Sequence, residues 1–183
     1  MKISRDKLVE NRRRILDAAA RLFRERGFEA VTVAEVMKAA ELTHGAFYNH
    51  FESKDDLIAK AFAHVLLPAP ENDRFAEMEF AEFARSYLSA AHRDDRGSGC
   101  MFGALGTEAA RCNDETRQVM TEAVRKQIDR FSTTAPGETA QERRRAAMAR
   151  WSAMVGAVIL ARTVDDPALS DELLSATLDA VEA

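Results

Sequence analysis

The residues with the clearest chemical potential lie together between positions 43 and 49. If a short helix covers residues 43–50, Leu42 and Phe47 anchor it to the interior. The remaining side chains then face outward: Thr43, His44, Gly45, Ala46, Tyr48 and Asn49. Hydroxyls and helix N-termini bind phosphate oxygens, and asparagine can read adenine with two hydrogen bonds. An exposed row with one aromatic and two small residues is unusual for a solvated helix and favours close approach to a nucleic-acid surface.

This row needs neighbouring elements to position it, and the preceding sequence predicts them. Apolar residues on one face indicate a first helix from about Asp6 to Arg26, and Gly27 follows as a left-handed C-cap. Thr32 and Glu35 form a capping box that opens a second helix over residues 33–40. Two short helices joined by a tight turn and packed on a longer one are typical of a helix-turn-helix.

The rest of the chain also has helical periodicity, and no stretch alternates apolar and polar residues as a strand would. Ser53 caps a helix over about 54–67. Later helices are predicted over about 75–92, 101–111, 115–131, 140–164 and 167–181. We therefore expect an all-α fold: a three-helix helix-turn-helix domain in residues 1–52, then a helical ligand-binding and dimerisation domain in residues 53–183, linked by helix 54–67.

Charge is unevenly distributed along the 183 residues. The formal net charge is −4, yet residues 1–54 carry eleven Lys and Arg against eight Asp and Glu, a balance of +3. A basic end on an acidic body suits a protein that contacts nucleic acid, although such a run can also be a solvated face. The longest apolar run, Met154–Ala161, is too short to span a membrane, and no secretory signal opens the chain. We expect a cytoplasmic protein without a membrane partner.

The stretch Ile15–Leu57 resembles the N-terminal domain of the tetracycline-repressor-like (TetR) family of transcriptional regulators. The shared motifs are LF-x(3)-G-F at Leu22–Phe28, T-V-x-x-V at Thr32–Val36, T-x-G-x-F-Y-x-H-F at Thr43–Phe51 and S-K-x-x-L at Ser53–Leu57. The resemblance covers about a quarter of the chain, and the combined spacing is highly specific.

The resemblance implies a role for individual residues. DNA phosphates would be contacted by Thr32, Thr43, Tyr48, His50 and Lys54. Base edges would be faced by Thr43, His44, Gly45 and Asn49. Other interpretations stay open, because the two threonines can be simple N-caps and His50 can be a surface histidine without a partner.

For the C-terminal part, the resemblance implies a helical domain that holds a ligand and dimerises. The segment Gly99–Arg111 is similar to a sub-group whose sixth helix begins with Gly-Cys and lines the pocket. Candidate pocket residues are Phe62, Phe83, Tyr87, Met101, Phe102, Leu105, Trp151 and Met154. Such aromatic and methionine side chains suit an apolar or aromatic ligand, but each can equally be ordinary core. The expected dimer interface comprises Ala153, Gly156, Ala157, Leu160, Leu173, Leu174 and Leu178.

These features together predict a homodimeric regulator, most simply a repressor that a small apolar or aromatic molecule releases from a palindromic operator in double-stranded DNA. Redox sensing through Cys100 or Cys112 is an alternative. An enzyme on an all-α scaffold is a weaker one, because the sequence has no glycine-rich phosphate loop and no metal-ligand cluster. No metal or cofactor is expected.

Overall fold

The computed structural model describes residues 4–73, 75 and 78–183, and within them it is all-helical, which confirms the predicted fold class. The elements are α1 (Arg5–Arg26), α2 (Val33–Ala39), the 3₁₀ helix η1 (His44–Asn49), α3 (Lys54–Leu66), the 3₁₀ turn η2 (Pro70–Asn72), α4 (Phe80–Tyr87), α5 (Ala90–Asp94), α6 (Met101–Ala109), α7 (Asp114–Ser132), α8 (Ala140–Thr163) and α9 (Pro167–Glu182). None of the described helices has the length and apolar character required to cross a membrane.

Capping residues set most of the helix starts as the sequence predicts. Thr32 and Glu35 satisfy each other's backbone N–H groups at the start of α2, and a second capping box opens α8. The Ser53 hydroxyl accepts the backbone N–H of Asp56 at the start of α3, and Asp166 caps α9 with Pro167 at its first position. These interactions span two to four residues, so a local sequence pattern is enough to locate them.

Two predicted helices differ from the structure. Residues 44–49 form a 3₁₀ helix instead of an α-helix. The helix predicted over 75–92 is divided: α4 ends at Tyr87 and α5 begins at Ala90, while residues 76–77 lie outside the described part of the chain. The break occurs because Ser89 is extended and its hydroxyl accepts the backbone N–H of His92, which starts a new helix.

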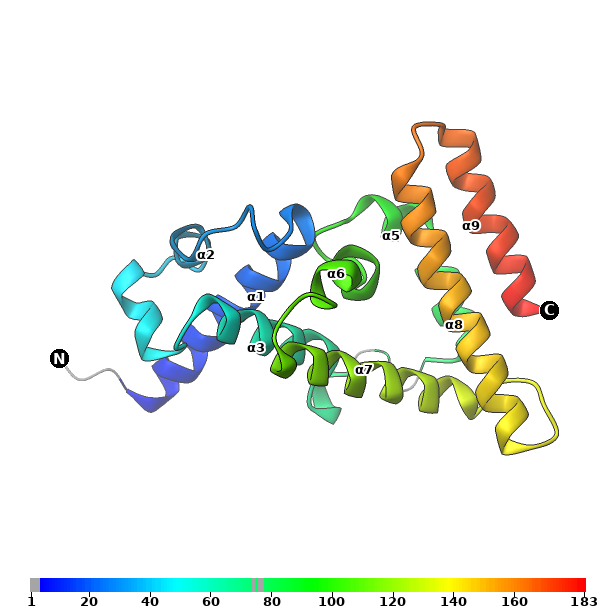
Figure 1. Cartoon of the computed structure of the whole chain (residues 1–183), viewed down its shortest axis with the longest axis horizontal. Helices are drawn as coiled ribbons and strands as arrows, with labels where there is room; N and C mark the ends of the chain where they lie inside the picture. The colour runs from blue at the N-terminus through cyan, green and yellow to red at the C-terminus, as the bar shows by residue number, and fades with distance from the viewer. Residues whose placement is uncertain (1–3, 74, 76–77) are drawn as a thin grey trace.

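The helices build two hydrophobic cores at opposite ends of the molecule. In Figure 1 the N-terminal helices lie at one end, and the antiparallel pair α8 and α9 lies at the other. The first core joins α1, α2, η1, α3 and part of α6, and the second joins α4, α8, α9 and the end of α7. Residues of α6 pack into both cores, since Met101 and Leu105 belong to the first and Phe102 packs against the second. This short helix therefore connects the two cores.

Two of the residues predicted to form a dimer interface are buried within the protomer itself. Ala157 and Leu174 are buried in the second core, because α8 and α9 pack against each other along that stripe. Ala153 and Leu160 face outward on α8, and Gly156, Leu173 and Leu178 are half-buried. The exposed surface of this helix pair thus includes only part of the predicted set.

Gly27 ends α1 with a positive φ of 78°, as a residue without a side chain allows. A Cβ atom there would also lie 3.0 Å from a carboxylate oxygen of Glu108 on α6. Gly106 is the opposite case, since it lies within α6 and a Cβ atom would have no neighbour within 4 Å.

We predict that Gly27→Ala lowers the free energy of unfolding by about 1 kcal/mol or more, because alanine rarely adopts this backbone conformation. The matched variant Gly106→Ala is expected to raise it by about 0.5–1 kcal/mol, since glycine costs stability within a helix. Urea unfolding of the two variants measures both effects, and equal unfolding midpoints would contradict the assigned difference.

Candidate nucleic-acid interface

The exposed row of η1 is held in place by one buried aromatic side chain. Phe47 is only 1% exposed, and its ring stacks on that of Phe51 with ring centroids 5.6 Å apart. Leu42 is half-buried against the same core, so the two predicted anchors are in place. Ala46 differs from its prediction, because it is half-buried and packs on this core instead of facing outward.

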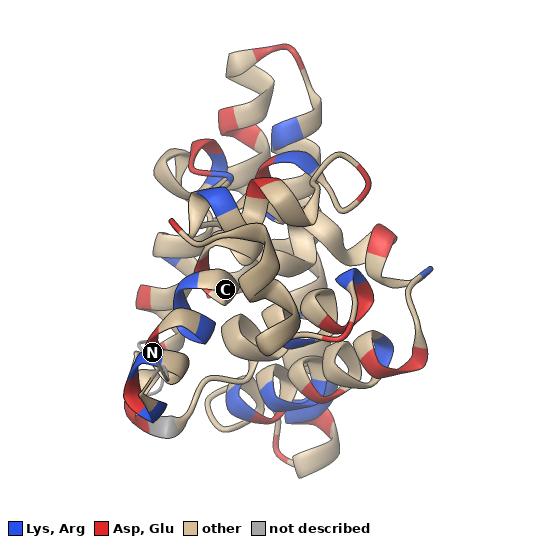
Figure 2. Cartoon of the chain, turned by 90° about the vertical axis from the view of Figure 1, so that its left-hand side faces the viewer, with Lys and Arg blue, Asp and Glu red and all other residues tan. Residues whose placement is uncertain are grey.

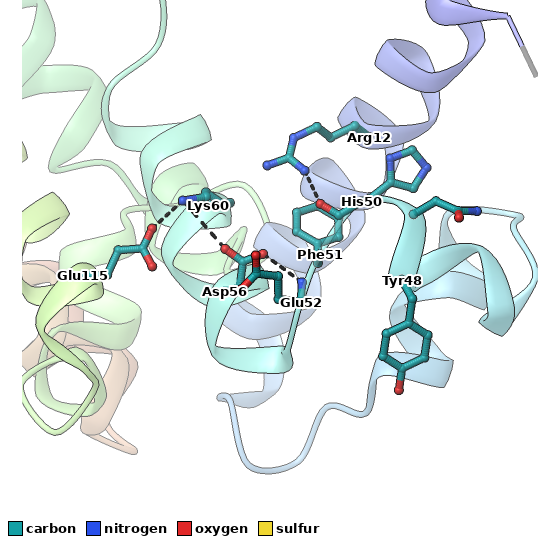
Figure 3. A pocket seen from close by; sticks show the side chains of 9 residues that line it. Arg12, Tyr48, His50, Phe51, Glu52, Asp56, Lys60 and Glu115 are labelled. Atoms are coloured by element: carbon teal, nitrogen blue, oxygen red, sulfur yellow. Dashed lines mark hydrogen bonds and ion pairs between the residues drawn. The ribbon is translucent and has the colours of Figure 1, made fainter.

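The other predicted outward residues do face solvent. Thr43, His44, Gly45 and Asn49 are exposed, and Tyr48 is 70% exposed (Figure 3). The Thr43 hydroxyl makes no capping hydrogen bond, although it starts η1, and a Cβ atom on Gly45 would meet nothing within 4 Å. Because an exposed tyrosine keeps a large apolar ring in water, this surface is suited to a partner that covers the ring.

The C-terminal end of η1 is tied to α1 by Arg12. Its guanidinium donates to the backbone carbonyl of His50 and lies 4.5 Å from the centre of the Phe51 ring. Partial burial and the nearby positive charge of Arg12 lower the pKa of His50, so its ring is neutral at pH 7. His50 is therefore a hydrogen-bonding group here and contributes no positive charge.

The turn between α2 and η1 contains a strained residue that carries its own ion pair. Glu41 has a φ of 54°, which is uncommon for a residue with a side chain. Its carboxylate accepts from the Arg14 guanidinium at 2.6 Å, and the next N–H, of Leu42, donates to the carbonyl of Met37 at 2.9 Å. These contacts hold the tight turn that sets the angle between the two short helices.

Lys54 and Glu108 meet at the backbone of Phe28. The Lys54 ammonium donates to the Phe28 carbonyl at 2.6 Å, while the Phe28 N–H donates to the Glu108 carboxylate at 2.8 Å. The Phe28 ring is buried and packs edge-on against Phe23 and Phe62. Residues from α1, α3 and α6 therefore converge on the connection that precedes α2.

Below the exposed row lies a groove of about 570 Å³ with charges of both signs (Figure 3). Lys60 on α3 pairs there with Glu115 on α7, and its ammonium lies 3.7 Å from a carboxylate oxygen of Asp56. Figure 2 views this end of the molecule and shows acidic and basic residues interspersed. The pairing connects the helix-turn-helix end to α7.

Thr32 has a capping role and is at the same time an exposed residue. Its hydroxyl accepts the Glu35 N–H at 3.2 Å and donates to the Glu35 carboxylate at 2.8 Å, yet the residue is exposed. Backbone and side-chain hydrogen bonds from Thr32, together with Arg26, lower the pKa of Glu35 to about 2.

Sequence reasoning missed Arg12, Arg14 and Glu108. Arg12 and Arg14 belong to a basic run on α1 that resembles any solvated face, and their partners lie 38 and 27 residues away. Glu108 is 80 residues from Phe28. No local pattern marks such long-range pairs.

The eight predicted pocket residues separate into two groups. Phe62, Met101 and Leu105 are buried in the first core. Phe83, Tyr87, Trp151 and Met154 are buried in the second, and Phe102 packs against them with its ring 5.7 Å from that of Trp151. The structure thus brings five of the eight side chains together, between α4, α6 and α8.

Comparisons with known proteins agree with this geometry. Residues 15–61 match the family described as "Bacterial regulatory proteins, tetR family". The chain is similar to the HTH-type transcriptional repressor DhaR of Mycobacterium sp. (strain GP1), with 26% identity over 110 residues, 58% of this chain and 56% of DhaR. It is also similar to the HTH-type transcriptional regulator AcrR of Shigella flexneri, with 45% identity over 51 residues, 28% of this chain and 24% of AcrR. The match spans about half the length of DhaR and a quarter of AcrR.

The fold is shared over nearly the whole chain. A TetR transcriptional regulator from Chloroflexus aurantiacus has a TM-score of 0.76 and 22% sequence identity, over 97% of this chain and 96% of that one. At this identity the likeness concerns the fold.

We predict that the Glu35 carboxylate stabilises the fold in a pH-dependent way. Because its folded pKa of about 2 lies below the usual 4.5, its contribution is complete above pH 4.5 and is lost as the pH falls toward 2. Wild type should therefore be more stable than Glu35→Gln at pH 7, with a difference that shrinks between pH 4.5 and pH 2 in urea titrations. Glu29→Gln, an exposed neighbour outside the capping box, is the control. A difference that stays constant over this range would contradict the prediction.

Proposed function

Because the chain belongs to the tetR family of bacterial regulatory proteins, we propose that it is a homodimeric transcriptional repressor that binds a palindromic operator and leaves it when a small molecule binds. The observation that carries this proposal is the exposed face of η1, where Tyr48 and Asn49 lie in solvent on the buried anchor Phe47. A major groove about 12 Å wide accepts such a short, firmly held helix.

The proposed division of contacts follows from the groups that are available. Thr32, Thr43, Tyr48, His50 and Lys54 would bind phosphates, which need hydrogen-bond donors and tolerate a neutral histidine. Thr43, His44, Gly45 and Asn49 would face base edges. Gly45 supports this because its open surface lets the backbone approach the duplex closely.

Dimerisation is proposed through the outer faces of α8 and α9. Large apolar side chains lie in solvent there, including Leu160, which is 53% exposed, and Ile159, beside the small residues Ala153 and Gly156. Small residues let helices approach closely, and exposed apolar ones gain free energy when a second copy covers them. Leu173 and Leu178 on α9 are half-buried at the edge of this surface. Two recognition helices per dimer would read the two halves of a palindrome.

The effector is proposed to bind among the five clustered side chains of the second core and to act through α6 and α3. Its binding free energy can release DNA only if it favours one spacing of the two recognition helices over another. Redox sensing is less well supported, because burial raises the pKa of both Cys100 and Cys112 and so disfavours the thiolate.

The DNA-binding proposal is tested by selection. The purified chain, incubated at low salt with a random double-stranded pool and no added effector, should enrich a palindrome. Asn49→Ala should then weaken binding to that duplex about 10-fold or more and relax the preference at one base pair of each half-site. Gln141→Ala, exposed on α8, is the control. The proposal fails if no duplex is retained, and the role of Asn49 fails if affinity and preference are unchanged.

The dimer surface is tested by charge insertion. Leu160→Arg should convert a dimer into a monomer in sedimentation velocity, because two desolvated guanidinium groups would face each other across the two-fold axis. Val9→Arg changes an apolar residue of α1 that is 65% exposed and should leave the dimer intact. A monomeric wild type, or a dimeric Leu160→Arg protein, would exclude this surface.

A further inference from the structure

The hydroxyl of Tyr87 is buried and has no well-formed hydrogen bond within the described residues. Tyr87 ends α4, is only 7% exposed, and its hydroxyl oxygen is shielded from solvent. The Cys100 thiol, a weak hydrogen-bonding group, lies beside this hydroxyl, and the positive charge of Arg162 also acts on it. A buried hydroxyl whose neighbour is only a thiol keeps part of its desolvation cost, so a stronger acceptor would stabilise it.

The start of α6 lies beside this hydroxyl and is only weakly capped. Cys100 occupies the N-cap position, and the N–H of Gly103 donates to its sulfur at 3.4 Å. Sulfur is a weak acceptor compared with the oxygen of Ser or Asp, so the N–H groups of this first turn keep capacity for a stronger one.

Arg162 on α8 brings a positive charge to the same place. It donates to the carbonyls of His92 and Arg93 and, in the described part of the chain, has no carboxylate within ion-pair distance. A Cβ atom built on Gly99 would lie 2.6 Å from the Nη2 atom of Arg162. A Cβ atom built on Gly103 would lie 3.8 Å from the Nη1 atom of the same arginine. Gly99 therefore lets the charge reach the start of α6.

The other charged and polar groups around these side chains do not supply the missing acceptor. Arg93 is held by Asp94 and Asp171. The ring of His92 accepts the Cys100 N–H through Nε2, so its Nδ1 carries the hydrogen and donates to the Tyr87 carbonyl at 2.6 Å. Burial and the charge of Arg96 lower the pKa of Arg162, and the charge of Asp95 raises it.

Several donors thus converge where the Cys100 sulfur is a weak acceptor and the two carbonyls bound to Arg162 leave one guanidinium nitrogen without a hydrogen bond to a described residue. We infer that a niche formed by Tyr87, Cys100, Gly103 and Arg162 binds the carboxylate of a small apolar or aromatic acid. The Tyr87 hydroxyl, the Arg162 guanidinium and the first turn of α6 would donate to the carboxylate. The acid's apolar part would pack on Trp151, whose ring centroid is 5.3 Å from that of Tyr87, and on Phe102. Cys100, Phe102, Gly103 and Arg162 are each half-buried, so the niche lies at the edge of the core.

Only the role of such an acid as the effector rests on the proposed function; its binding to the niche does not. Binding is therefore measured first without DNA, by calorimetry and thermal unfolding of the full chain. The probes are benzoate, 4-phenylbutyrate and hexanoate, each compared with its neutral amide. At least one acid should bind and raise the melting temperature, and its amide should bind at least 10-fold more weakly.

Tyr87→Phe is the sharpest variant, because it removes only an oxygen whose neighbour in the fold is the weakly bonding Cys100 thiol. It should fold at least as stably as wild type and bind the acid about 10-fold or more weakly, as expected for one lost hydrogen bond to a charged group. Arg162→Gln should also lose binding, whereas Arg96→Gln, a neighbouring exposed arginine, should keep it. If none of the three acids binds, if acid and amide bind alike, or if Tyr87→Phe binds as wild type does, the inference is wrong.

A second measurement separates this inference from the repressor proposal. A bound acid should release the protein from the duplex obtained by selection. Acid binding without release would keep the niche but remove its role as the effector site. Retention of a duplex together with no acid binding would remove the niche and leave the DNA-binding proposal standing.

Discussion

The arrangement of the N-terminal end depends on the burial of Phe47. A six-residue 3₁₀ helix has too few hydrogen bonds to persist alone, so the shape of η1 must come from packing. Burial of one phenylalanine side chain contributes about 1.5–3 kcal/mol, which exceeds what any exposed side chain of η1 could supply. Arg12 holds the other end of η1 to α1. With these contacts in place, the exposed face has a fixed orientation and its residues can all contact one partner surface.

A second constraint joins this end to the rest of the chain. Phe28 connects Lys54 on α3 to Glu108 on α6, and the N-cap residue of α6, Cys100, lies beside the buried Tyr87 hydroxyl. A nine-residue helix thus has one end at the proposed acid-binding niche and the other at the connection into α2. A small displacement at the start of α6 would also move Glu108 near its end, since α6 is packed into both cores. This arrangement gives a physical route by which a ligand could alter the position of η1.

The local features of the fold could be read from the sequence, and the long-range ones could not. Capping boxes, Ser53 and the Asp166–Pro167 pair act over two to four residues and therefore leave a pattern. The break after Tyr87 was missed, because one serine cap outweighs an otherwise continuous apolar stripe. The predicted dimer face included Ala157 and Leu174, since a helix that is apolar on two sides gives no sign of which side the chain itself covers. Arg12 and Glu108 act on residues 38 and 80 positions away, and a single sequence contains no trace of either pairing.

The central claim is that the exposed face of η1 enters a major groove in each half of an operator. Methylation protection with dimethyl sulfate on the selected duplex tests it directly, because the reagent modifies guanine N7 in the major groove and adenine N3 in the minor groove. The account predicts that guanine N7 atoms become protected in two clusters about one helical turn apart, and that Asn49→Ala needs about 10-fold more protein to give the same protection. Protection of adenine N3 alone, or an unprotected major groove under saturating protein, would contradict it.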